Sequence, residues 1–456
     1  MVMGSLPEQV DLAVIGGGVG GYVAAIRAAQ LGLNVTVVEK NKMGGHCLNY
    51  ACIPSKTFIK IADIFYEAQH SQKFGINVQG ASIDPKAMLK WRMDASSKLE
   101  NGVTSLCKLN QVEIVKGTAT FLDSNTLQLT NGTSLDFKKA LVATGSEPTP
   151  MKGFEFGGNI IDYKQALMLE FIPKSMAIIG AGYVAVEIGT LYAKLGTKVS
   201  VIARTDVLSR FDRDAVALVK ARMQALGVKV YAGATPTSHE GESVTLGSGE
   251  KLDAQVIVVA IGLGPYTKGL GLENTKVKMN EKGFVQVDNR LTTTDSNILA
   301  VGDVIGEPML AHKAIRQGVV VAEVAAGKKS AYDNQVVPAV IFSDPEVAIA
   351  GTIEEGNGIN VTKFPLSALG RAVALDTTNG FVKIAYDENK LVKGVEIVSD
   401  EASSMISEAA LAIEMGATLE DIAATIHPHP TYSEAVQEAA EAALGQAIHF
   451  FYPPKK

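Results

Sequence analysis

The stretch Asp11–Gly21 reads DLAVIGGGVGG, and it decides the fold expected for the start of the chain. Residues 11–15 form a short run typical of a buried strand, and the glycine-rich turn after it leads into a helix-like segment. In a GxGxxG turn, the first glycine permits the tight turn, the second lets a pyrophosphate approach the backbone, and the third lets helix and strand pack closely. Gly16, Gly18 and Gly21 hold these positions. The stretch therefore predicts a βαβ unit that binds a dinucleotide at the N-terminus of its helix.

A second strand-like run, residues 34–39, follows this helix and ends in Glu39. Its place is near the roughly 20-residue spacing at which a carboxylate binds the ribose hydroxyls of a dinucleotide. Because strand, turn, helix and carboxylate occur in this order, the turn is interpreted as a nucleotide site rather than as a turn that merely needs glycines.

The same pattern returns as SMAIIGAGYVA over residues 175–185, where Gly180 and Gly182 take the first two glycine positions. Two features differ from the first copy. Ala185 replaces the third glycine, and the position of the carboxylate is Ala203, followed by Arg204. An arginine here could pair with the 2′-phosphate of NADP, whereas a carboxylate would favour NAD. A solvated surface arginine is the other interpretation, so the coenzyme stays open as NAD or NADP.

Three later strand-like runs each end in glycine, at Gly145, Gly262 and Gly302. From Pro338 onward the pattern changes to shorter strands and to helix-like segments over 401–415 and 432–449. We therefore predict an α/β chain with two Rossmann-like dinucleotide-binding domains and a C-terminal α+β domain. Breaks are expected near residues 150, 270 and 335.

Two cysteines, Cys47 and Cys52, lie five residues apart in the stretch GGHCLNYACIPSK, residues 44–56. On a regular helix, residues at this spacing are separated by about 7.5 Å of rise. A disulfide needs its α-carbons within about 6.8 Å. A bridge can therefore close only in a loop or a distorted turn, and such a bridge is expected to be reducible. Metal binding is the weaker interpretation because no second cysteine pair or cysteine–histidine cluster completes four ligands. Cys107 is expected to be a buried thiol with no role.

Composition narrows the classes of function. The 456 residues carry a net charge of −6 and no basic run, so nucleic acid and anionic membrane surfaces are not expected partners. No apolar run approaches the roughly 20 residues that span a bilayer. The N-terminus does not read as a secretory signal, so a cytoplasmic location is expected, although a transit peptide removed earlier stays possible.

Four signatures together resemble the pyridine nucleotide–disulfide oxidoreductases. They are the cysteine stretch, the two glycine turns, Gly302-Asp303, and the C-terminal stretch HPHPTYSEA of residues 427–435. Within that family, residues 309–314 and 408–417 resemble the dihydrolipoamide dehydrogenase branch. The resemblance covers nearly the whole chain. It implies an FAD-binding domain over 1–150 completed by the central segment 271–335, an NAD(P)-binding domain over 151–270, and a dimerisation domain over 336–456.

The resemblance also implies the roles of individual residues. Cys47 would exchange with a dihydrolipoyl thiol, and Cys52 would face the flavin. His429 would be the base, Glu434 would orient it, and Lys56 would pair with Glu187 near the flavin. His427 is expected to be structural, and for His312 packing is as plausible as a place at the flavin edge. The expected cofactor-binding residues are Gly16, Gly18, Gly21, Glu39, Lys56, Thr144, Gly145, Gly302, Asp303 and Ala311 for FAD, and Gly180, Gly182, Arg204 and Gly262 for the nicotinamide coenzyme.

In this family the histidine reaches the disulfide of the other subunit, so a homodimer is implied. Lipoyl domains of 2-oxo acid dehydrogenase or glycine cleavage complexes would be the partners. Departures from the family pattern are His46, Ala51 and the absence of arginine in residues 261–266. Two other functions stay open. An NADPH-dependent disulfide reductase, similar to glutathione or mercuric reductase, is favoured by Arg204, and a non-catalytic flavoprotein subunit is disfavoured by the retained cysteines and histidine.

Overall fold

The computed structural model describes residues 8–451 and divides them into two compact units. One unit contains the described residues up to Ile172 together with Val258–Asp333. The other contains Pro173–Ile257 together with the described residues from Asn334 onward. Among the described residues, no helix is long and apolar enough to cross a membrane.

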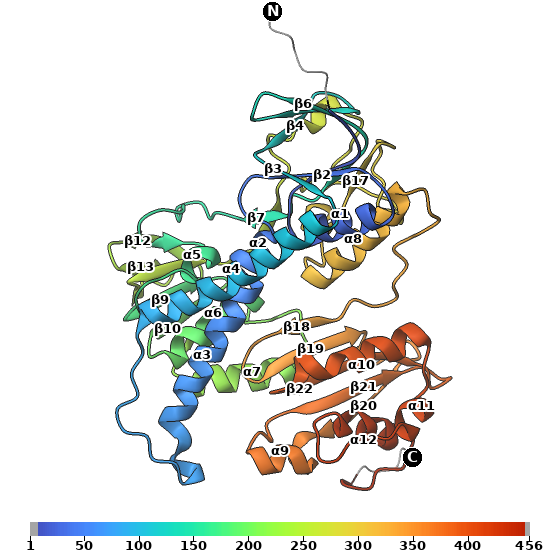
Figure 1. Cartoon of the computed structure of the whole chain (residues 1–456). Coiled ribbons are helices and arrows are strands. Elements are labelled where there is room, and N and C mark those ends of the chain that lie inside the picture. Colours follow the sequence, from blue (N-terminus) through green and yellow to red (C-terminus); the bar gives the residue numbers. More distant parts are fainter. Residues whose placement is uncertain (1–7, 452–456) are drawn as a thin grey trace, which may run out of the picture. The chain divides into compact units, whose positions relative to one another are not determined.

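A largely parallel sheet forms the centre of the first unit (Figure 1). Strand β1 lies between β2 and β6, β2 pairs with β3, and β17 pairs with β6, all in parallel. Strands β5 and β4 extend β6 in antiparallel pairing, and β16 pairs with β7 in a separate two-stranded sheet. The strands are β1 Glu8–Ile15, β2 Val35–Glu39, β3 Glu113–Lys116, β4 Ala119–Phe121, β5 Thr126–Leu129, β6 Ser134–Val142, β7 Ser146–Pro148, β8 Ile160–Ile161, β16 Leu263–Pro265 and β17 Ile298–Ala300.

Alternate residues of β1 enter two different hydrophobic cores, because successive side chains of a strand point to opposite faces. Leu12 and Val14 pack in the core that contains Ala24 of α1. Ala13 and Ile15 pack in the core that contains Phe137. The sheet is therefore covered on both faces, as expected for parallel strands.

Helices α1 and α8 lie side by side on this sheet (Figure 1). Their backbones approach so closely that a Cβ on Gly318 would lie 2.6 Å from the carbonyl oxygen of Gly20. The helical segments of the unit are α1 Val19–Gln30, α2 Gly45–Asn49, α3 Cys52–His70, α4 Pro85–Leu109, α5 Tyr163–Ala166 and α8 Ala311–Ala325, with short 3₁₀ turns η1 Ser71–Phe74, η2 Leu272–Asn274 and η3 Gly302–Ile305.

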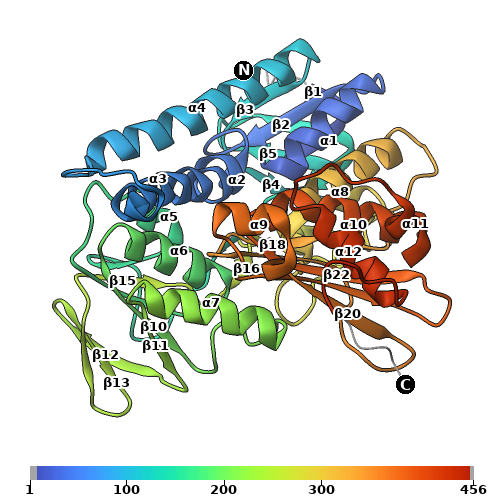
Figure 2. The same ribbon diagram turned by 90° about the horizontal axis from the view of Figure 1, so that it is seen from below.

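The second unit begins with another βαβ unit. Strands β9, β10 and β11 pair in parallel, and the sheet continues from β9 to β15. Strands β12, β13 and β14, which follow β11 in the chain, form a separate antiparallel sheet (Figure 2). The elements are β9 Ser175–Ile179, α6 Tyr183–Lys194, β10 Lys198–Ala203, α7 Arg213–Ala225, β11 Lys229–Ala232, β12 Pro236–Glu240, β13 Ser243–Leu246, β14 Lys251–Asp253 and β15 Val256–Val259.

An antiparallel sheet, ordered β18-β19-β22-β21-β20, carries the C-terminal part of this unit. Helix α10 packs on β19 and β22, whereas α12 packs on β20 and β21. The elements are β18 Ala339–Ile341, β19 Glu346–Gly351, β20 Asn360–Pro365, η4 Leu366–Ala368, α9 Gly370–Leu375, β21 Phe381–Tyr386, β22 Val392–Ser399, α10 Ala402–Met415, α11 Leu419–Ala424 and α12 Glu434–Ala443.

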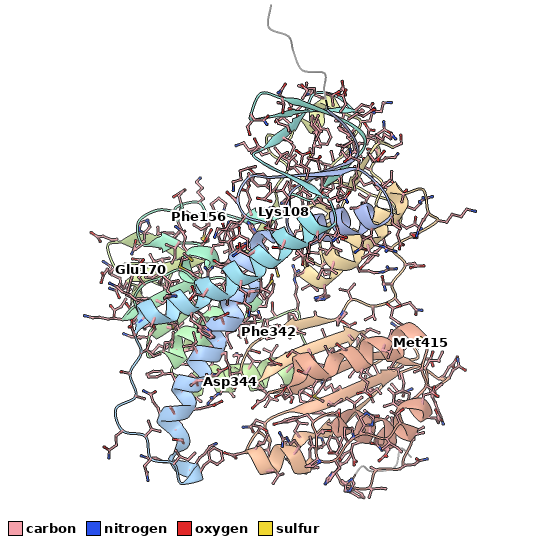
Figure 3. All side chains as sticks on the ribbon, in the orientation of Figure 1. Lys108, Phe156, Glu170, Phe342, Asp344 and Met415 are labelled. Carbon is pink, nitrogen blue, oxygen red and sulfur yellow. The ribbon has the colours of Figure 1, made fainter. Side chains whose placement is uncertain are left out.

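Asp344 ties the two parts of the second unit together (Figure 3). Its carboxylate accepts a hydrogen bond from Arg222 of α7 at 2.9 Å and pairs with Lys194 of α6 at 2.7 Å. Although burial opposes ionisation, these two cations hold the pKa of Asp344 below its usual value. The carboxylate therefore stays charged and links the C-terminal part to both helices.

The predicted α/β class, with two dinucleotide-binding folds and a C-terminal α+β part, is confirmed. The division into four domains stays a prediction. The helix expected over 432–449 is wrong in extent, because α12 covers only Glu434–Ala443. Gly445, at a φ of 74°, lies in the left-handed region just after the last turn, which ends the helix.

Candidate active site

The first glycine turn has the backbone geometry of a nucleotide site. Gly16 has a φ of 103°, which side chains other than glycine rarely adopt. A Cβ on Gly21 would lie 1.9 Å from the Gly16 carbonyl oxygen, whereas a Cβ on Gly18 would meet nothing within 4 Å. Backbone atoms of the turn therefore crowd the Gly21 position. The space beside Gly18 is open, and this is the position where a pyrophosphate would approach.

Glu39 lies against this turn at the carboxyl end of β2. One carboxylate oxygen accepts a hydrogen bond from the Gly17 amide at 2.7 Å, and the other accepts from the Asn41 amide at 2.6 Å. Each oxygen keeps a lone pair, because a carboxylate has about four acceptor positions. The side chain is thus fixed by the backbone and can still accept a ribose hydroxyl.

The side chain of Asp303 places a second carboxylate in the same unit. It lies half-buried in η3, and the Ser146 hydroxyl donates to its carboxylate at 2.7 Å. Burial raises the pKa of Asp303, opposed by the Ser146 hydrogen bond and by nearby Lys313. An open glycine turn, an oriented Glu39 and the half-buried carboxylate of Asp303 can bind the pyrophosphate and hydroxyl groups of a flavin dinucleotide, so the residues present fit FAD.

The remaining residues predicted to bind FAD lie in the same unit. Thr144 donates its hydroxyl to the Tyr266 carbonyl at 2.6 Å, and the Gly145 carbonyl accepts from the Tyr266 amide at 3.0 Å. The Gly302 amide donates to Gln317 at 2.9 Å. Ala311 is the first residue of α8. Gly262, predicted for the coenzyme, falls in this first unit with a φ of 144°.

The two cysteines lie on either side of a break between helices. Cys47 belongs to α2, and Cys52 is the first residue of α3. Tyr50 and Ala51 between them leave helical geometry, with φ angles of −134° and −130°. The prediction that the pair does not share a regular helix is therefore confirmed. Both side chains are thiols in this structure, and a hydrogen bond joins them.

The surroundings of Cys47 favour its protonated form. The hydrogen bond with Cys52, followed by burial, raises the pKa of the Cys47 thiol well above its usual range. Lys56 lowers that pKa and Asp303 raises it, so both charges lie near the pair. A thiol at Cys47 therefore ionises less readily than an ordinary cysteine.

Two buried side chains, Asn49 between the cysteines and Arg92 of α4, hold the segment at the helix break by hydrogen bonds. Neither of them was predicted from the sequence. The Asn49 amide donates to the carbonyl oxygens of Met43 and Gly45, at 2.9 and 3.1 Å. Arg92 donates to the Asn49 carbonyl oxygen. The position of Asn49 between the cysteines was a signal for its role, but nothing in the sequence linked Arg92 to it.

His46 is half-buried next to Cys47 and contacts Tyr163, whose hydroxyl lies 3.5 Å from its Nδ1. Burial lowers the pKa of His46 to about 4, with Lys164 and Lys40 contributing. The ring is therefore neutral at physiological pH. Cys107 is also buried, and burial raises its pKa to about 11, in keeping with the predicted inert thiol.

In the second unit, His429 and Glu434 form a hydrogen-bonded pair. The Nδ1 of His429 lies 2.8 Å from a Glu434 oxygen, and the Thr431 amide donates to the other oxygen at 2.8 Å. Burial opposes ionisation, but these hydrogen bonds hold the pKa of Glu434 below its usual value. Because a carboxylate only accepts, Nδ1 donates and Nε2 is left as an acceptor on a ring that is 78% exposed.

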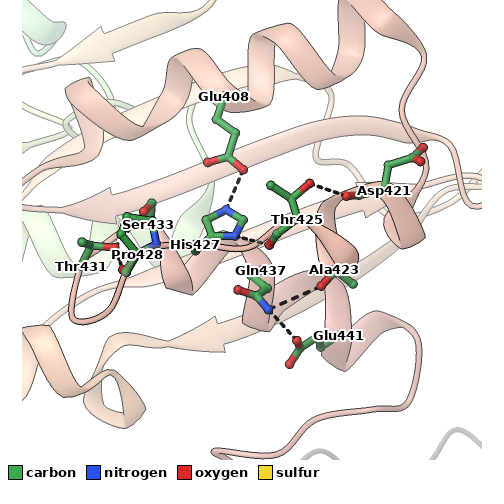
Figure 4. Close-up of polar contacts among 10 residues, drawn as sticks. All are labelled: Glu408, Asp421, Ala423, Thr425, His427, Pro428, Thr431, Ser433, Gln437 and Glu441. Carbon is green, nitrogen blue, oxygen red and sulfur yellow. Dashed lines mark hydrogen bonds and ion pairs between the residues drawn. The ribbon is translucent and has the colours of Figure 1, made fainter.

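His427 anchors the segment that carries His429 (Figure 4). Its Nδ1 lies 2.8 Å from the Thr425 carbonyl oxygen, and its Nε2 lies 2.8 Å from Glu408 of α10. Both neighbours are acceptors, so both contacts are satisfied only when the ring carries two N–H protons. The predicted structural role thus has a physical basis that the sequence did not reveal.

Glu187 lies in α6 of the second unit and is 7% exposed. Its carboxylate accepts a hydrogen bond from the Phe342 amide at 3.1 Å. The structure thus brings Cys47, Cys52, Lys56 and Asp303 together in the first unit, and His429 with Glu434 in the second. The predicted pairing of Lys56 with Glu187 joins residues of different units and stays a prediction.

The second glycine turn repeats the first in its backbone. Gly180 has a φ of 127°, and its amide donates to the Ile202 carbonyl at 3.0 Å. A Cβ on Gly182 would meet nothing within 4 Å, as at Gly18. Arg204 follows Ala203, the last residue of β10, and is exposed. Among the described residues, no group of three or more His, Cys, Asp or Glu side chains could hold a metal ion.

Comparison with known proteins identifies the same architecture. Residues 10–318 match the pyridine nucleotide-disulphide oxidoreductase family, and residues 337–440 match the dimerisation domain of that family. The dihydrolipoyl dehydrogenase of Geobacillus stearothermophilus is 44% identical over 98% of this chain and 99% of its own length. The dihydrolipoyl dehydrogenase of Bacillus subtilis is 42% identical over 98% and 99%. The crystal structure of LpdA from Mycobacterium tuberculosis superposes with a TM-score of 0.89 at 26% identity, covering 96% of this chain and 99% of LpdA.

Proposed function

The chain belongs to the pyridine nucleotide-disulphide oxidoreductase family, and from this premise we propose that it is a dihydrolipoyl dehydrogenase. It oxidises a protein-bound dihydrolipoyl group to the disulfide and passes the electrons through FAD to a nicotinamide dinucleotide. Relatives that cover nearly the whole chain support this activity. The observation that carries the proposal is the cysteine pair at the break between α2 and α3, in the same unit as the open glycine turn and Glu39.

FAD fits the first unit through Gly16, Gly18, Gly21, Glu39 and Asp303, and when bound it supplies a two-electron acceptor that exchanges a hydride with the nicotinamide. The protein's own contribution is to place two thiols of different acidity in that unit. Lys56 stabilises a thiolate at the pair, because a nearby cation favours the charged form. Cys47 keeps its proton, so we assign the thiolate to Cys52.

Thiol–disulfide exchange then balances as follows. A lipoyl thiolate attacks the Cys47 sulfur of the oxidised pair, the Cys47–Cys52 bond breaks, and Cys52 leaves with the electron pair as a thiolate. The second lipoyl thiolate attacks the first lipoyl sulfur, and Cys47 leaves in turn. Two lipoyl thiols become one lipoyl disulfide, and the cysteine disulfide becomes a thiol at Cys47 and a thiolate at Cys52. One proton stays on Cys47, and the other leaves through the base.

His429 is proposed as that base. A thiol has a pKa of about 8.5 and is mostly protonated at neutral pH, so a base must remove its proton. Nε2 of His429 is exposed and available as an acceptor, because Glu434 fixes the proton on Nδ1. Glu434 stays ionised and stabilises the imidazolium after proton transfer.

We propose a homodimer in which the partner subunit's His429 serves the cysteine pair. The dimerisation domain supports a dimer of this chain. Exposed apolar side chains on and near α10, namely Leu411, Met415 and Ile426, provide the kind of surface that a partner covers (Figure 3 labels Met415). Lipoyl domains of 2-oxo acid dehydrogenase or glycine cleavage complexes are the proposed protein partners. The cytoplasmic location stays a prediction from the sequence.

The runner-up function is an NADPH-dependent disulfide reductase, which Arg204 favours because the second turn lacks a carboxylate. The exposed His429–Glu434 pair suits either direction of thiol–disulfide exchange, so it does not separate the two functions. The relatives' names weigh against the runner-up.

The test is an assay of the FAD-loaded protein with dihydrolipoamide and either coenzyme. Rapid turnover is expected, and His429→Gln should lower it by about 10²- to 10⁴-fold, the usual contribution of a general base, while FAD stays bound. His70→Gln, at the exposed end of α3, is the matched control and should turn over normally.

Wild-type turnover by His429→Gln would overturn the base assignment. A flavin-loaded protein that oxidises no dithiol, but reduces glutathione disulfide with NADPH, would replace the proposed function with the runner-up. A flavin-loaded protein without any thiol-dependent turnover would indicate a non-catalytic subunit.

A further inference from the structure

The chain between the two cysteines is held at its break by hydrogen bonds to main-chain oxygens. The amides of Tyr50 and Ala51 both donate to the His46 carbonyl at 2.8 Å. In a continuous helix, the Asn49 carbonyl would accept from the amide four residues later. The chain has left helical geometry by then, and the guanidinium of Arg92 donates to this oxygen. Arg92 therefore takes the place of a helical donor at the break.

The start of the cysteine segment is fixed by backbone contacts with the first glycine turn. The Gly44 amide donates to the Gly17 carbonyl at 2.8 Å. A Cβ on Gly45 would lie only 2.7 Å from the Cα of Gly18, so the two chains touch there. At the exit toward Cys52, by contrast, a side chain from another helix holds the segment.

Arg92 belongs to α4, which packs against both α2 and α3 (Figure 1). It is 4% exposed, and among residues 8–451 no carboxylate forms an ion pair with it. Burying a cation without a counter-charge costs free energy, and an apolar side chain of similar volume would avoid that cost. The hydrogen bond to the Asn49 carbonyl is the interaction that this buried guanidinium makes. We therefore look to the cysteine segment for its role.

We propose that Arg92 is a positioning residue for the cysteine pair and acts through the Asn49 carbonyl. It holds the break in place while the pair is reduced, so that Cys47 and Cys52 stay within reach of each other. Both thiols are indeed joined by a hydrogen bond in this structure. Because the dithiol is already ordered, less conformational entropy is lost when the disulfide closes. This role rests on the proposed function, since it takes the pair as redox-active.

Redox titration with dithiothreitol tests this role without any turnover. The FAD-loaded protein is equilibrated, in the absence of oxygen, with mixtures of reduced and oxidised dithiothreitol, and protein thiols are then alkylated and counted by mass spectrometry. The two cysteines give two electrons and two protons to oxidised dithiothreitol, which forms one protein disulfide and one reduced dithiothreitol. Arg92→Met should lower the equilibrium constant of this oxidation by about tenfold, as for loss of a charge-assisted hydrogen bond.

Thermal unfolding in both oxidation states separates positioning from simple packing. If Arg92 only supported the fold, Arg92→Met would destabilise the dithiol and disulfide forms equally and leave the redox equilibrium unchanged. A positioning residue matters less once the disulfide ties the two cysteines together. We therefore expect the reduced variant to lose more thermal stability, relative to the reduced wild type, than the oxidised variant loses.

The matched control is Lys90→Met on the same helix, which removes an exposed cation that pairs with Asp94 at 2.5 Å. This variant should titrate as the wild type does. Arg92→Lys keeps a cationic donor and should recover most of the wild-type equilibrium constant. If Arg92→Met does not fold, Arg92→Gln, which lacks the charge and the reach of the guanidinium, replaces it with the same expected shift.

Equal equilibrium constants for the wild type and Arg92→Met, or equal shifts in Arg92→Met and Lys90→Met, would overturn the positioning role and leave the proposed dehydrogenase intact. A wild-type pair that stays reduced at every ratio of the two forms of dithiothreitol would overturn the proposed function, and the positioning role with it.

Discussion

The two glycine turns of this chain share a backbone and differ in one side chain. Each follows a buried strand, bends at a glycine with positive φ and donates one amide to the neighbouring strand. The first ends its second strand with Glu39, held by the Gly17 and Asn41 amides, and the second ends it with Ala203. The comparison teaches that strand, turn and helix repeat the same backbone in the two units, whereas the residue at the strand end decides whether a carboxylate is held against the turn.

The third position of the turn gives the largest expected effect. Gly21→Ala would place a Cβ 1.9 Å from the Gly16 carbonyl oxygen, and backbone atoms cannot yield as a side chain can. We expect a loss of about 3 kcal/mol or more in the free energy of unfolding and loss of bound FAD. Thermal unfolding and the flavin absorbance of the purified protein measure both.

The matched change in the second turn is Ala185→Gly, at the equivalent position. It should cost only about 1 kcal/mol, the usual penalty for glycine in a helix. Equal destabilisation by the two changes would show that the third position does not distinguish the turns, contrary to the geometry.

Removing the carboxylate of the first turn should have a smaller effect. Glu39→Ala leaves the Gly17 and Asn41 amides without their acceptor and removes the proposed ribose ligand. We expect FAD to bind about 10- to 100-fold more weakly, as for loss of a charged hydrogen bond. Equilibrium titration of the apoprotein with FAD checks this, and an unchanged Kd would remove Glu39 from the site.

A buried carboxylate without such donors should make the stability depend on pH. Glu396 in β22 is fully buried, and burial, with Asp212 nearby, raises its pKa to about 8, opposed by Lys383. The native state thus binds a proton that the unfolded chain has lost between about pH 4.5 and pH 8. Stability is full below that window and falls as pH rises through it.

Glu396→Gln should remove this pH dependence. The mutant should gain stability relative to the wild type as pH rises from 5 to 8, by at most about 1.4 kcal/mol per pH unit. Urea unfolding of both proteins at several pH values measures the slope. Parallel stability curves would mean that Glu396 is ionised in the native state.

Local sequence patterns were enough to predict both glycine turns, because the positions of Gly16, Gly180 and Glu39 follow from strand and helix periods. The same patterns placed the cysteines outside one regular helix. They could not reveal contacts between residues distant in the sequence. Ser146 against Asp303, and Glu408 against His427, depend on how loops and helices pack rather than on any local signal.

The end of the C-terminal helix α12 could not be predicted from the local pattern either. Residues after Ala443 have helix-forming composition, and only the conformation of Gly445 ends the helix earlier. A single glycine after an alanine-rich run can lie inside or beyond a helix, so its effect is not readable from periodicity.

The inequality of the two cysteines is the central claim, and the absorbance of the FAD-loaded Cys47→Ser protein tests it most directly. A Cys52 thiolate left beside oxidised flavin should give a long-wavelength absorption band that Cys52→Ser lacks and Cys107→Ser does not alter. No such band in Cys47→Ser, or an equal band in Cys52→Ser, would contradict the account.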